Sequence, residues 1–294
     1  MNNTVTEKES LLHRLWFLAR KNPLSLISLG LFGFYVFIAL TANYWVPFDP
    51  LKSNTAIALE APNISHWFGT DHLGRDVFSR VMVATRLDLG IAFTAVAISF
   101  VIGTALGSMV AYFGGWYERI ICRVGDIVLA FPLFVLAMGI VAVMGNSLIN
   151  VIYATAIINI PFYIRIARAE VSLQRDRQYV QVALLSGNSH MRTLLHHIFP
   201  NCLPNLVVQI STNMGWAILN RCRVIIYWLR WFVHQSAEWG ILVAEGADYI
   251  ISGQWWLVLF PGFILMLAVF SFNLLGDTLR DLVDPQKGLN NGTK

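Results

Sequence analysis

The sequence predicts an all-α membrane protein with six transmembrane helices. Hydrophobic residues make up 56% of the chain and charged residues only 13%, with a mean hydropathy of +0.58, whereas a soluble domain carries about 25% charged residues. Apolar runs alternate with polar segments, and the runs have about the 20 residues that a helix needs to cross a bilayer. Lysine and arginine are also unevenly distributed between alternate polar segments, as expected for a membrane protein with a fixed orientation.

Six apolar runs define the expected helices. They lie near residues 24–46, 89–112, 126–145, 147–166, 203–229 and 256–276. The implied organisation is a polar N-terminal tail at 1–23, a transmembrane domain at 24–285 and a C-terminal tail at 286–294. Two longer polar segments interrupt the domain, a first outer loop at 47–88 and a central loop at 167–202. No small-residue cleavage site closes the first run, so we expect an uncleaved span rather than a signal peptide.

The distribution of basic residues predicts that both termini and the central loop are cytoplasmic. With the N-terminus inside, the inner segments hold twice as many Lys and Arg residues as the outer segments, and cytoplasmic segments carry this excess in membrane proteins. Arg221, Arg223 and Arg230 fit this orientation poorly, because they fall at an outer helix end where charge is costly near hydrocarbon.

Two features inside the expected spans concern packing. Gly103, Gly107 and Ala111 lie four residues apart in the second span, and small residues at this spacing let helices approach closely, within the subunit or with a partner. Asp126 and Pro132 begin the third span, where they are interpreted as a helix-start anion and a kink.

The sequence also excludes several classes of function. A net charge of +4 without a basic arm gives no reason to expect a nucleic-acid partner. The three cysteines form no spaced pair, which argues against a disulfide framework or a zinc site. The sequence shows no catalytic triad spacing, metal-ligand cluster or intramembrane run of acids. We therefore expect no enzyme activity in this chain, and a carrier built on it must take its energy from another protein.

The central loop is the longest polar interval among the later spans. Val180, Ala183, Leu184 and Gly187 recur at helical spacing, which predicts a short helix with one apolar and one polar face. Gly187 is expected to end that helix at a corner that a larger side chain would fill, and a second helix is expected from near Ser189 toward Pro200. The pair would form a docking knob; an ordinary amphipathic helix pair is the plainer alternative.

This loop resembles the cytoplasmic coupling loop of bacterial ABC importer permeases. That family's pattern is Glu-Ala-Ala, three residues, Gly, nine residues, then Ile-x-Leu-Pro. Ala183, Gly187 and Pro200 match it, whereas Gln181, Val182, His197 and Phe199 depart from it. The resemblance implies that the loop contacts an ATPase, and its expected coupling residues are Tyr179, Gln181, Ala183, Gly187, His197 and Pro200.

The first outer loop carries a longer motif, Phe-Gly-Thr-Asp-His-Leu-Gly-Arg-Asp-Val-Phe-Ser-Arg, which ends at Arg80. Thr70 or Asp71 can cap a helix with Gly74, Arg75 and Asp76 in its early turns. Gly69 and Gly74 have the spacing of a phosphate loop, but Arg75-Asp76 stands where Lys-Ser/Thr is needed. His66 and His72 near Asp71 could ligate a metal, although a capped, hydrogen-bonded loop is the plainer interpretation.

This motif is very similar to a signature of the dipeptide/oligopeptide branch of those permeases. The matching residues are Gly69, Thr70, Asp71, Gly74, Arg75, Asp76, Ser79 and Arg80. A second match follows the last span, at Asn273, Gly276, Asp277, Arg280, Asp281, Asp284 and Pro285. The charged members of this second group also fit a plain role as a solvated cap on the inner side of the membrane.

The resemblance implies the permease subunit of an importer that moves di- and oligopeptides across the bacterial inner membrane by alternating access. It further implies a related second permease, two cytoplasmic ATPase subunits that bind the ATP, and an extracytoplasmic binding protein. The permease itself would need no cofactor. Nickel, glutathione and antimicrobial peptides are the alternative substrates. A channel or secondary carrier would need pore charges or repeated half-helices, and the sequence indicates neither.

The resemblance breaks at Arg221–Gln235 and resumes at Ser236-Ala-Glu-Trp-Gly. Members of this branch typically read Ala-Ala-Gly-Leu-Ser-Phe-Ile-Gly-Leu after the residue equivalent to Asn220. One extra base after the Asn220 codon converts codons for that string into codons for residues 221–229 as written, and two further insertions restore the frame. We therefore expect a frameshifted stretch, with genuine divergence as the alternative.

Overall fold

The protein is described by a computed structural model that covers residues 23–145, 147–228 and 237–283. The described helices are α2 (Pro23–Trp45), α3 (Val77–Phe113), α4 (Gly115–Ala130), α5 (Leu133–Met144), α6 (Leu148–Arg175), α7 (Gln178–Leu185), α8 (His190–Thr193), α9 (Phe199–Trp228), α10 (Trp239–Ala247) and α11 (Trp256–Val283). A 3₁₀ turn at Thr55–Ile57 and a π-helical turn at Leu194–Ile198 complete them. Within these ranges the extended pairing is a single isolated bridge, and the predicted all-α class is confirmed.

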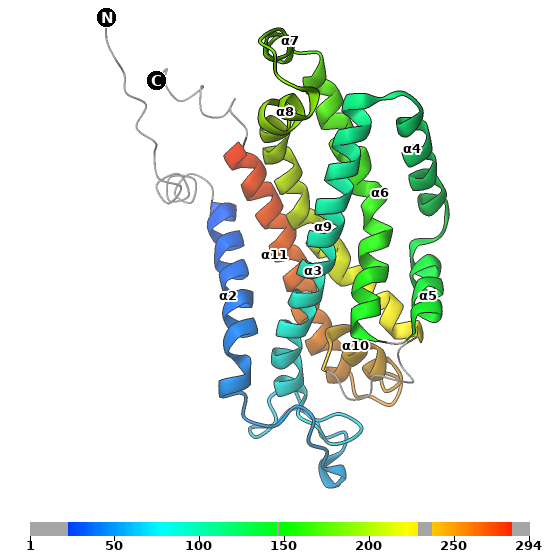
Figure 1. Cartoon of the computed structure of the whole chain (residues 1–294). Coiled ribbons are helices and arrows are strands. Elements are labelled where there is room, and N and C mark those ends of the chain that lie inside the picture. Colours follow the sequence, from blue (N-terminus) through cyan, green and yellow to red (C-terminus); the bar gives the residue numbers. More distant parts are fainter. Residues whose placement is uncertain (1–22, 146, 229–236, 284–294) are drawn as a thin grey trace, which may run out of the picture.

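The long helices lie side by side in one bundle (Figure 1). α3 packs mainly on α6, and α11 packs on α9 and α2. α2 begins and α11 ends at the end of the bundle that carries α7 and α8, whereas the loop between α2 and α3 lies at the opposite end together with α10 (Figure 1). We call these the α7 end and the loop end.

Four helices are long and apolar enough to cross a membrane: α2, α3, α6 and α11. A fifth crossing is possible if α4 and α5 count as one span, but the two are bent by 100°. The predicted span at 126–145 is therefore broken where a kink at Pro132 was expected, and its first part belongs to α4, which begins earlier, at Gly115. Pro132 lacks an N–H and disfavours helix in the residue before it, and Phe131 is accordingly extended, with φ −81° and ψ 145°.

Asp126 lies within α4 rather than at a helix start, and its carboxylate accepts a hydrogen bond of 2.7 Å from Arg165 on α6. α9 runs along the bundle between its two ends (Figure 1) but does not have the composition of the four candidate spans. The described part of the chain thus supports four or five of the six predicted spans.

The α3–α6 interface depends on small residues. A Cβ atom at Gly103 would lie 2.5 Å from the Cβ of Tyr163, and one at Gly107 would lie 2.5 Å from the carbonyl oxygen of Ile164. Such separations leave no room for a side chain, so both glycines allow α3 and α6 to approach closely. The predicted close approach is confirmed, and it lies within the subunit.

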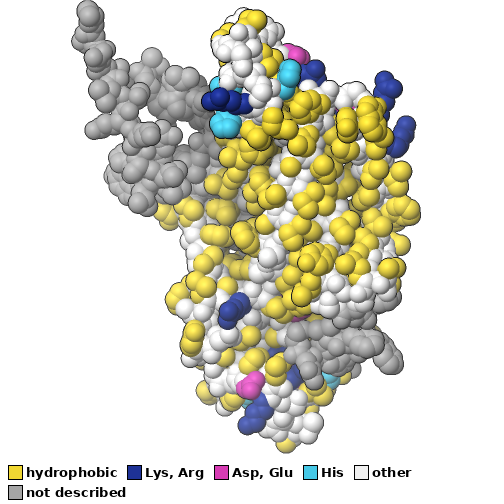
Figure 2. Space-filling view, viewed as in Figure 1, with side chains coloured by type: hydrophobic (Ala, Val, Ile, Leu, Met, Phe, Trp, Pro, Cys, Tyr) yellow, Lys and Arg dark blue, Asp and Glu magenta, His cyan; other side chains and the backbone are white. Residues whose placement is uncertain are grey.

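The surface fits a bilayer environment. Figure 2 shows apolar side chains covering the middle of one face, with charged side chains mostly gathered toward its two ends. Many large apolar side chains on this bundle are exposed, including Phe37 at 59%, Phe93 at 60% and Val101 at 63%. Exposed apolar surface on this scale is stable when lipid, rather than water, surrounds it.

Candidate functional site

The outer-loop motif ends in a well-formed helix cap. The side chain of Asp76 accepts hydrogen bonds from the Ser79 backbone N–H at 2.8 Å and from the Ser79 hydroxyl at 2.6 Å, which makes it the N-cap of α3. The His66 ring lies 2.9 Å from the other oxygen of the same carboxylate. The prediction that Thr70 or Asp71 caps a helix containing residues 74–76 is therefore wrong, because α3 begins at Val77.

Thr70 and Asp71 instead organise the loop before α3. The Thr70 hydroxyl donates to the Ile57 carbonyl and accepts from the Glu60 N–H. Asp71 accepts from the backbone N–H groups of Leu73 and Arg75, both at 2.9 Å. These bonds satisfy polar groups that are buried away from water.

Gly69 and Gly74 both have positive φ, +73° and +70°. A Cβ at Gly74 would lie 1.8 Å from the carbonyl oxygen of Asn54, so this position admits glycine alone. Two glycines of the signature are therefore explained by loop geometry rather than by phosphate binding.

Four charged side chains form a buried charge cluster at the loop end: Asp71, Arg75, Arg80 and Glu245. Asp71 pairs with Arg75 at 2.6 Å and also with Arg80, while Glu245 lies 3.2 Å from Arg80 and 3.5 Å from Arg75. All four side chains are at most 11% exposed. Burial raises the pKa of Asp71, but Arg80 and Arg75 lower it by more, so it lies below its usual range.

The cluster also bears on the metal alternative. Ligand atoms of Asp71, His72 and Glu245 lie within 4.8 Å of one another, but both carboxylates are already neutralised by arginines. The His72 ring stacks on Tyr249, with centroids 5.9 Å apart. This arrangement favours an ion-paired loop anchor over a cation site.

α10 supplies contacts that the sequence did not reveal. Glu245 is one of them, and Trp239 is another: it is fully buried, and its indole N–H donates to the Val81 carbonyl at 3.0 Å. The Trp239 backbone N–H donates to the carboxylate of Asp88 at 2.9 Å. Through these bonds α10 is fixed against the first turns of α3.

The predicted coupling loop forms a knob, defined here as residues 176–198, at the α7 end (Figure 1). α6 continues to Arg175, so the loop starts later than the predicted residue 167. Ser189 caps α8, as predicted. The helical backbone runs from His190 toward Pro200 as expected, and the π-helical turn joins α8 to α9 without a break.

The expected coupling residues do not share one surface. Ala183 is buried, the Tyr179 hydroxyl donates to the Gln174 side chain at 3.0 Å, and His197 is half-buried. Gln181 and Pro200 are exposed. The most exposed apolar side chain of α7 is Leu185, with 88% of its surface exposed. No sequence motif had marked this residue as a contact.

Gly187 has a φ of +86° and nothing within 4 Å of the position a Cβ would take. The expected packed corner is therefore open space, and the reason for glycine here is the left-handed backbone that closes α7. The helix end is satisfied by the N–H groups of Gly187 and Asn188, which donate to the carbonyls of Leu184 and Ala183.

Polar and apolar contacts tie the knob to the bundle. The Tyr112 hydroxyl, near the end of α3, lies 2.9 Å from the ring nitrogen of His190 on α8. Buried Val180 and Leu194 of the knob belong to one apolar cluster with Tyr112 of α3 and Val171 of α6. The knob is therefore packed against both α3 and α6.

The C-terminal signature is split between packing and surface. A Cβ at Gly276 would lie 3.0 Å from the hydroxyl oxygens of Ser211 and Thr212 on α9, and Asn273 approaches Gly215 on the same helix. Asp277 and Arg280 are exposed and Asp281 is half-buried, as a solvated cap requires. Asp284 and Pro285 lie outside the described residues, as do the side chains of 220–228 and all of 229–236, where the frameshift is expected.

Comparison with known proteins places the chain in a family. Residues 103–288 match the family model described as binding-protein-dependent transport system inner membrane component, and residues 10–62 match the N-terminal transmembrane domain of oligopeptide transport permease C. The dipeptide transport system permease protein of Alkalihalophilus pseudofirmus is 38% identical, covering 91% of this chain and 87% of its own length.

Two further relatives carry other substrates in their names. The nickel transport system permease protein of Escherichia coli is 34% identical over 88% of this chain and 93% of its own length. A glutathione transport system permease protein of Escherichia coli is 34% identical over 93% of this chain and 90% of its own length. The chain therefore belongs to the binding-protein-dependent transport system inner membrane component family, in the peptide/nickel branch of ABC importer permeases.

Proposed function

We propose that this chain is one of two permease subunits of an ATP-driven importer of di- or oligopeptides that works by alternating access. The observation that carries the proposal is the similarity to dipeptide permeases along nearly the whole chain. The buried charge cluster at one end and the exposed knob at the other fit a subunit that contacts different partners on its two sides.

We propose that the protein lies in the bacterial inner membrane with its α7 end on the cytoplasmic side. The starts of α2 and the end of α11 lie at that end (Figure 1), so both tails and the knob fall on the side with the excess of Lys and Arg. α9 is proposed as the sixth span, because it runs beside α11 and α3.

The proposed partners are a related second permease, two ATPase subunits and an extracytoplasmic binding protein, with lipid around the bundle. ATP is bound by the ATPases, and the permease needs no cofactor of its own. The knob, with Val182 60% and Leu185 88% exposed, is the proposed ATPase contact, since exposed apolar groups at the centre of an interface supply binding energy. The loop at 47–76 is the proposed contact for the binding protein.

Nickel and glutathione are the alternative substrates, because permeases for both are similar to this chain; antimicrobial peptides are a further alternative. A secondary carrier or channel is a more remote alternative function. The deciding experiment is uptake into proteoliposomes that contain this chain with its second permease and ATPases, with binding protein outside. ATP-dependent uptake of a labelled dipeptide is expected, and uptake of nickel or glutathione in its place would redirect the proposal.

The knob is tested by Leu185→Ser. Removing this exposed side chain should weaken binding of the ATPase about tenfold, while leaving the stability of the permease unchanged. Ile251→Ser is the matched control, because Ile251 is 98% exposed in the segment between α10 and α11. Equal effects of the two variants would remove the knob from the coupling mechanism.

Topology has its own test. A cysteine in place of Ser189, the N-cap of α8, should crosslink to the ATPase and be protected from membrane-impermeant reagents outside intact cells. Labelling of that cysteine from outside would reverse the proposed orientation.

A further inference from the structure

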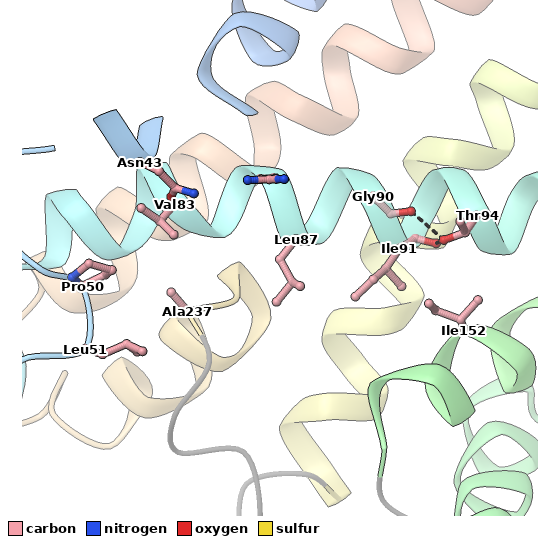
Figure 3. A pocket seen from close by; sticks show the side chains of 11 residues that line it. Asn43, Pro50, Leu51, Val83, Leu87, Gly90, Ile91, Thr94, Ile152 and Ala237 are labelled. Atoms are coloured by element: carbon pink, nitrogen blue, oxygen red, sulfur yellow. Dashed lines mark hydrogen bonds between the residues drawn. The ribbon is translucent and has the colours of Figure 1, made fainter. Parts of the chain in front are cut away.

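A cavity with a volume of about 510 Å³ lies in the half of the bundle nearer the loop end. Its walls come from the last turn of α2 and the segment after it, one face of α3, the first turns of α6 and the residue two before α10 (Figure 3). Volumes of 300–1,000 Å³ are typical of small-molecule sites. The cavity is therefore large enough for a dipeptide.

Most of the cavity wall is apolar. Val83, Leu87 and Ile91 follow one another at one-turn spacing along α3, and Ile152 faces them from α6 (Figure 3). The Thr94 hydroxyl at one side is engaged within its own helix, donating to the carbonyls of Gly90 at 2.6 Å and Ile91 at 3.1 Å. The wall can thus receive an apolar side chain, and Thr94 is not a free donor.

Arg86 also lines this cavity. Its side chain is exposed, and no hydrogen bond or ion pair to it occurs within the described ranges. Arg80, one and a half turns earlier on α3, is buried and doubly paired. Arg165 and Arg168 on α6 are paired even though both are largely exposed.

Arg86 lies about 14 Å from the start of α3 at 1.5 Å per residue. It falls just before residues 89–112, the apolar run expected to cross the membrane, so it stands at the outer edge of that candidate span. A guanidinium beside apolar walls is stabilised strongly by an anion, and ionisable groups in spans usually mark a ligand path. The amide of Asn43 lines the same cavity (Figure 3) and likewise has no hydrogen bond within the described part of the chain.

We propose that this cavity is a binding station for a solute that carries a carboxylate and an apolar side chain, with Arg86 as the ion-pair partner of the carboxylate. Asn43 supplies a further donor, and the Val83–Leu87–Ile91 face receives the apolar side chain. Within the proposed peptide importer, on which this inference rests, the solute is a peptide and the carboxylate is its C-terminus.

The test uses the assembled transporter without binding protein, with Leu87→Cys as a reporter in the cavity wall. A maleimide labels this cysteine, and the rate is measured against increasing Ala-Leu or its C-terminal amide. Ala-Leu should protect the cysteine, and the amide should require about a tenfold higher concentration for the same protection. Arg86→Gln should raise the half-protecting concentration of Ala-Leu about tenfold and leave that of the amide unchanged.

Arg123→Gln is the matched control, because Arg123 is also exposed and lacks an ion pair among the described residues, but lies on α4 outside the cavity. Equal protection in the parent and Arg86→Gln proteins would overturn the inference. So would a labelling rate set by the phosphatidylglycerol content of the vesicles, which would assign Arg86 to a lipid phosphate. Loss of the second permease from Arg86→Gln preparations would assign it to that subunit instead.

The two proposals fail separately. A transporter that imports labelled dipeptide while Ala-Leu leaves Leu87→Cys unprotected would overturn the cavity assignment alone. A transporter that imports no peptide, yet shows Arg86-dependent protection by a carboxylate, would overturn the peptide-importer proposal and leave the cavity as a site for another carboxylate.

Discussion

At the loop end of the bundle, Asp71, Arg75, Arg80 and Glu245 are buried and paired with one another, whereas at the α7 end the knob exposes Leu185 and is tied down by few polar contacts. Buried charges tolerate little change, because removing one member leaves the others without compensation. Exposed side chains can be replaced with small effects on stability. The comparison indicates that the loop end fixes the fold and the α7 end is left free for a partner.

The largest difference between the two regions should come from single charge removals. Asp71→Asn leaves Arg75 and Arg80 with one carboxylate, and should cost about 3–5 kcal/mol of unfolding free energy. Asp126→Asn, which breaks a pair whose side chains are 62% and 55% exposed, should cost less than about 1 kcal/mol. Thermal unfolding of the detergent-solubilised proteins measures both, and similar losses would contradict the contrast.

Glycine replacement gives the next effect. Gly74→Ala must displace the Asn54 backbone in addition to adopting positive φ, and should cost about 2–3 kcal/mol. Gly187→Ala meets open space and should cost only about 1 kcal/mol for its left-handed backbone. Gly187→Asn should recover part of that loss, because asparagine adopts this conformation more readily. A Gly187→Ala cost equal to that of Gly74→Ala would show that the knob is as constrained as the loop.

The contrast also shows what sequence could and could not predict. Apolar runs identified α2, α6 and α11, because a single apolar stretch of sufficient length decides a span. The start of α3 was missed because Thr70 and Asp71 were taken as the candidate caps and Asp76 was placed inside the helix. In the structure Asp76 is the cap, and Asp71 is engaged by Arg75 and Arg80 instead.

The sequence pattern could not predict contacts between residues far apart in the chain. Glu245 lies 165 residues from Arg80, and neither its neighbours nor its spacing mark it as the second carboxylate of the cluster. The outer-loop signature itself was located from sequence, and its residues do lie together. Whether Arg221–Gln235 is frameshifted is decided by resequencing the source DNA, because the side chains there lie outside the described residues.

Acidification should weaken the loop end specifically. Burial raises the pKa of Asp71, but Arg80 and Arg75 depress it below the ordinary value of about 4. A depressed carboxyl stabilises the fold above its unfolded-state pKa, and that contribution is lost as the pH falls through the lower folded-state pKa. The unfolding temperature should therefore hold from pH 7 to about 5 and fall below about pH 4. Protease cleavage within residues 47–76 should increase over the same range; unchanged cleavage would contradict the role of Asp71.

A small effect on stability is expected at the α7 end, in Tyr112→Phe. The ring of Tyr112 packs edge-on to His190 with centroids 5.8 Å apart, and phenylalanine keeps that contact, so the variant removes only the hydrogen bond. The net loss should be about 0.5–1.5 kcal/mol.

Its functional effect should be larger than its effect on stability, because this hydrogen bond fixes the orientation of α8 on the end of α3, whereas the surrounding apolar cluster gives no directional contact. Peptide imported per ATP hydrolysed should fall in Tyr112→Phe, with ATPase binding unchanged. Tyr117→Phe is the control, since Tyr117 is 58% exposed on α4 and its ring stacks on Trp116. If both variants keep the parental ratio of import to hydrolysis, the force on the knob must reach the bundle through α6 or the π-helical turn into α9, and the Tyr112–His190 bond serves only to hold α8 in place.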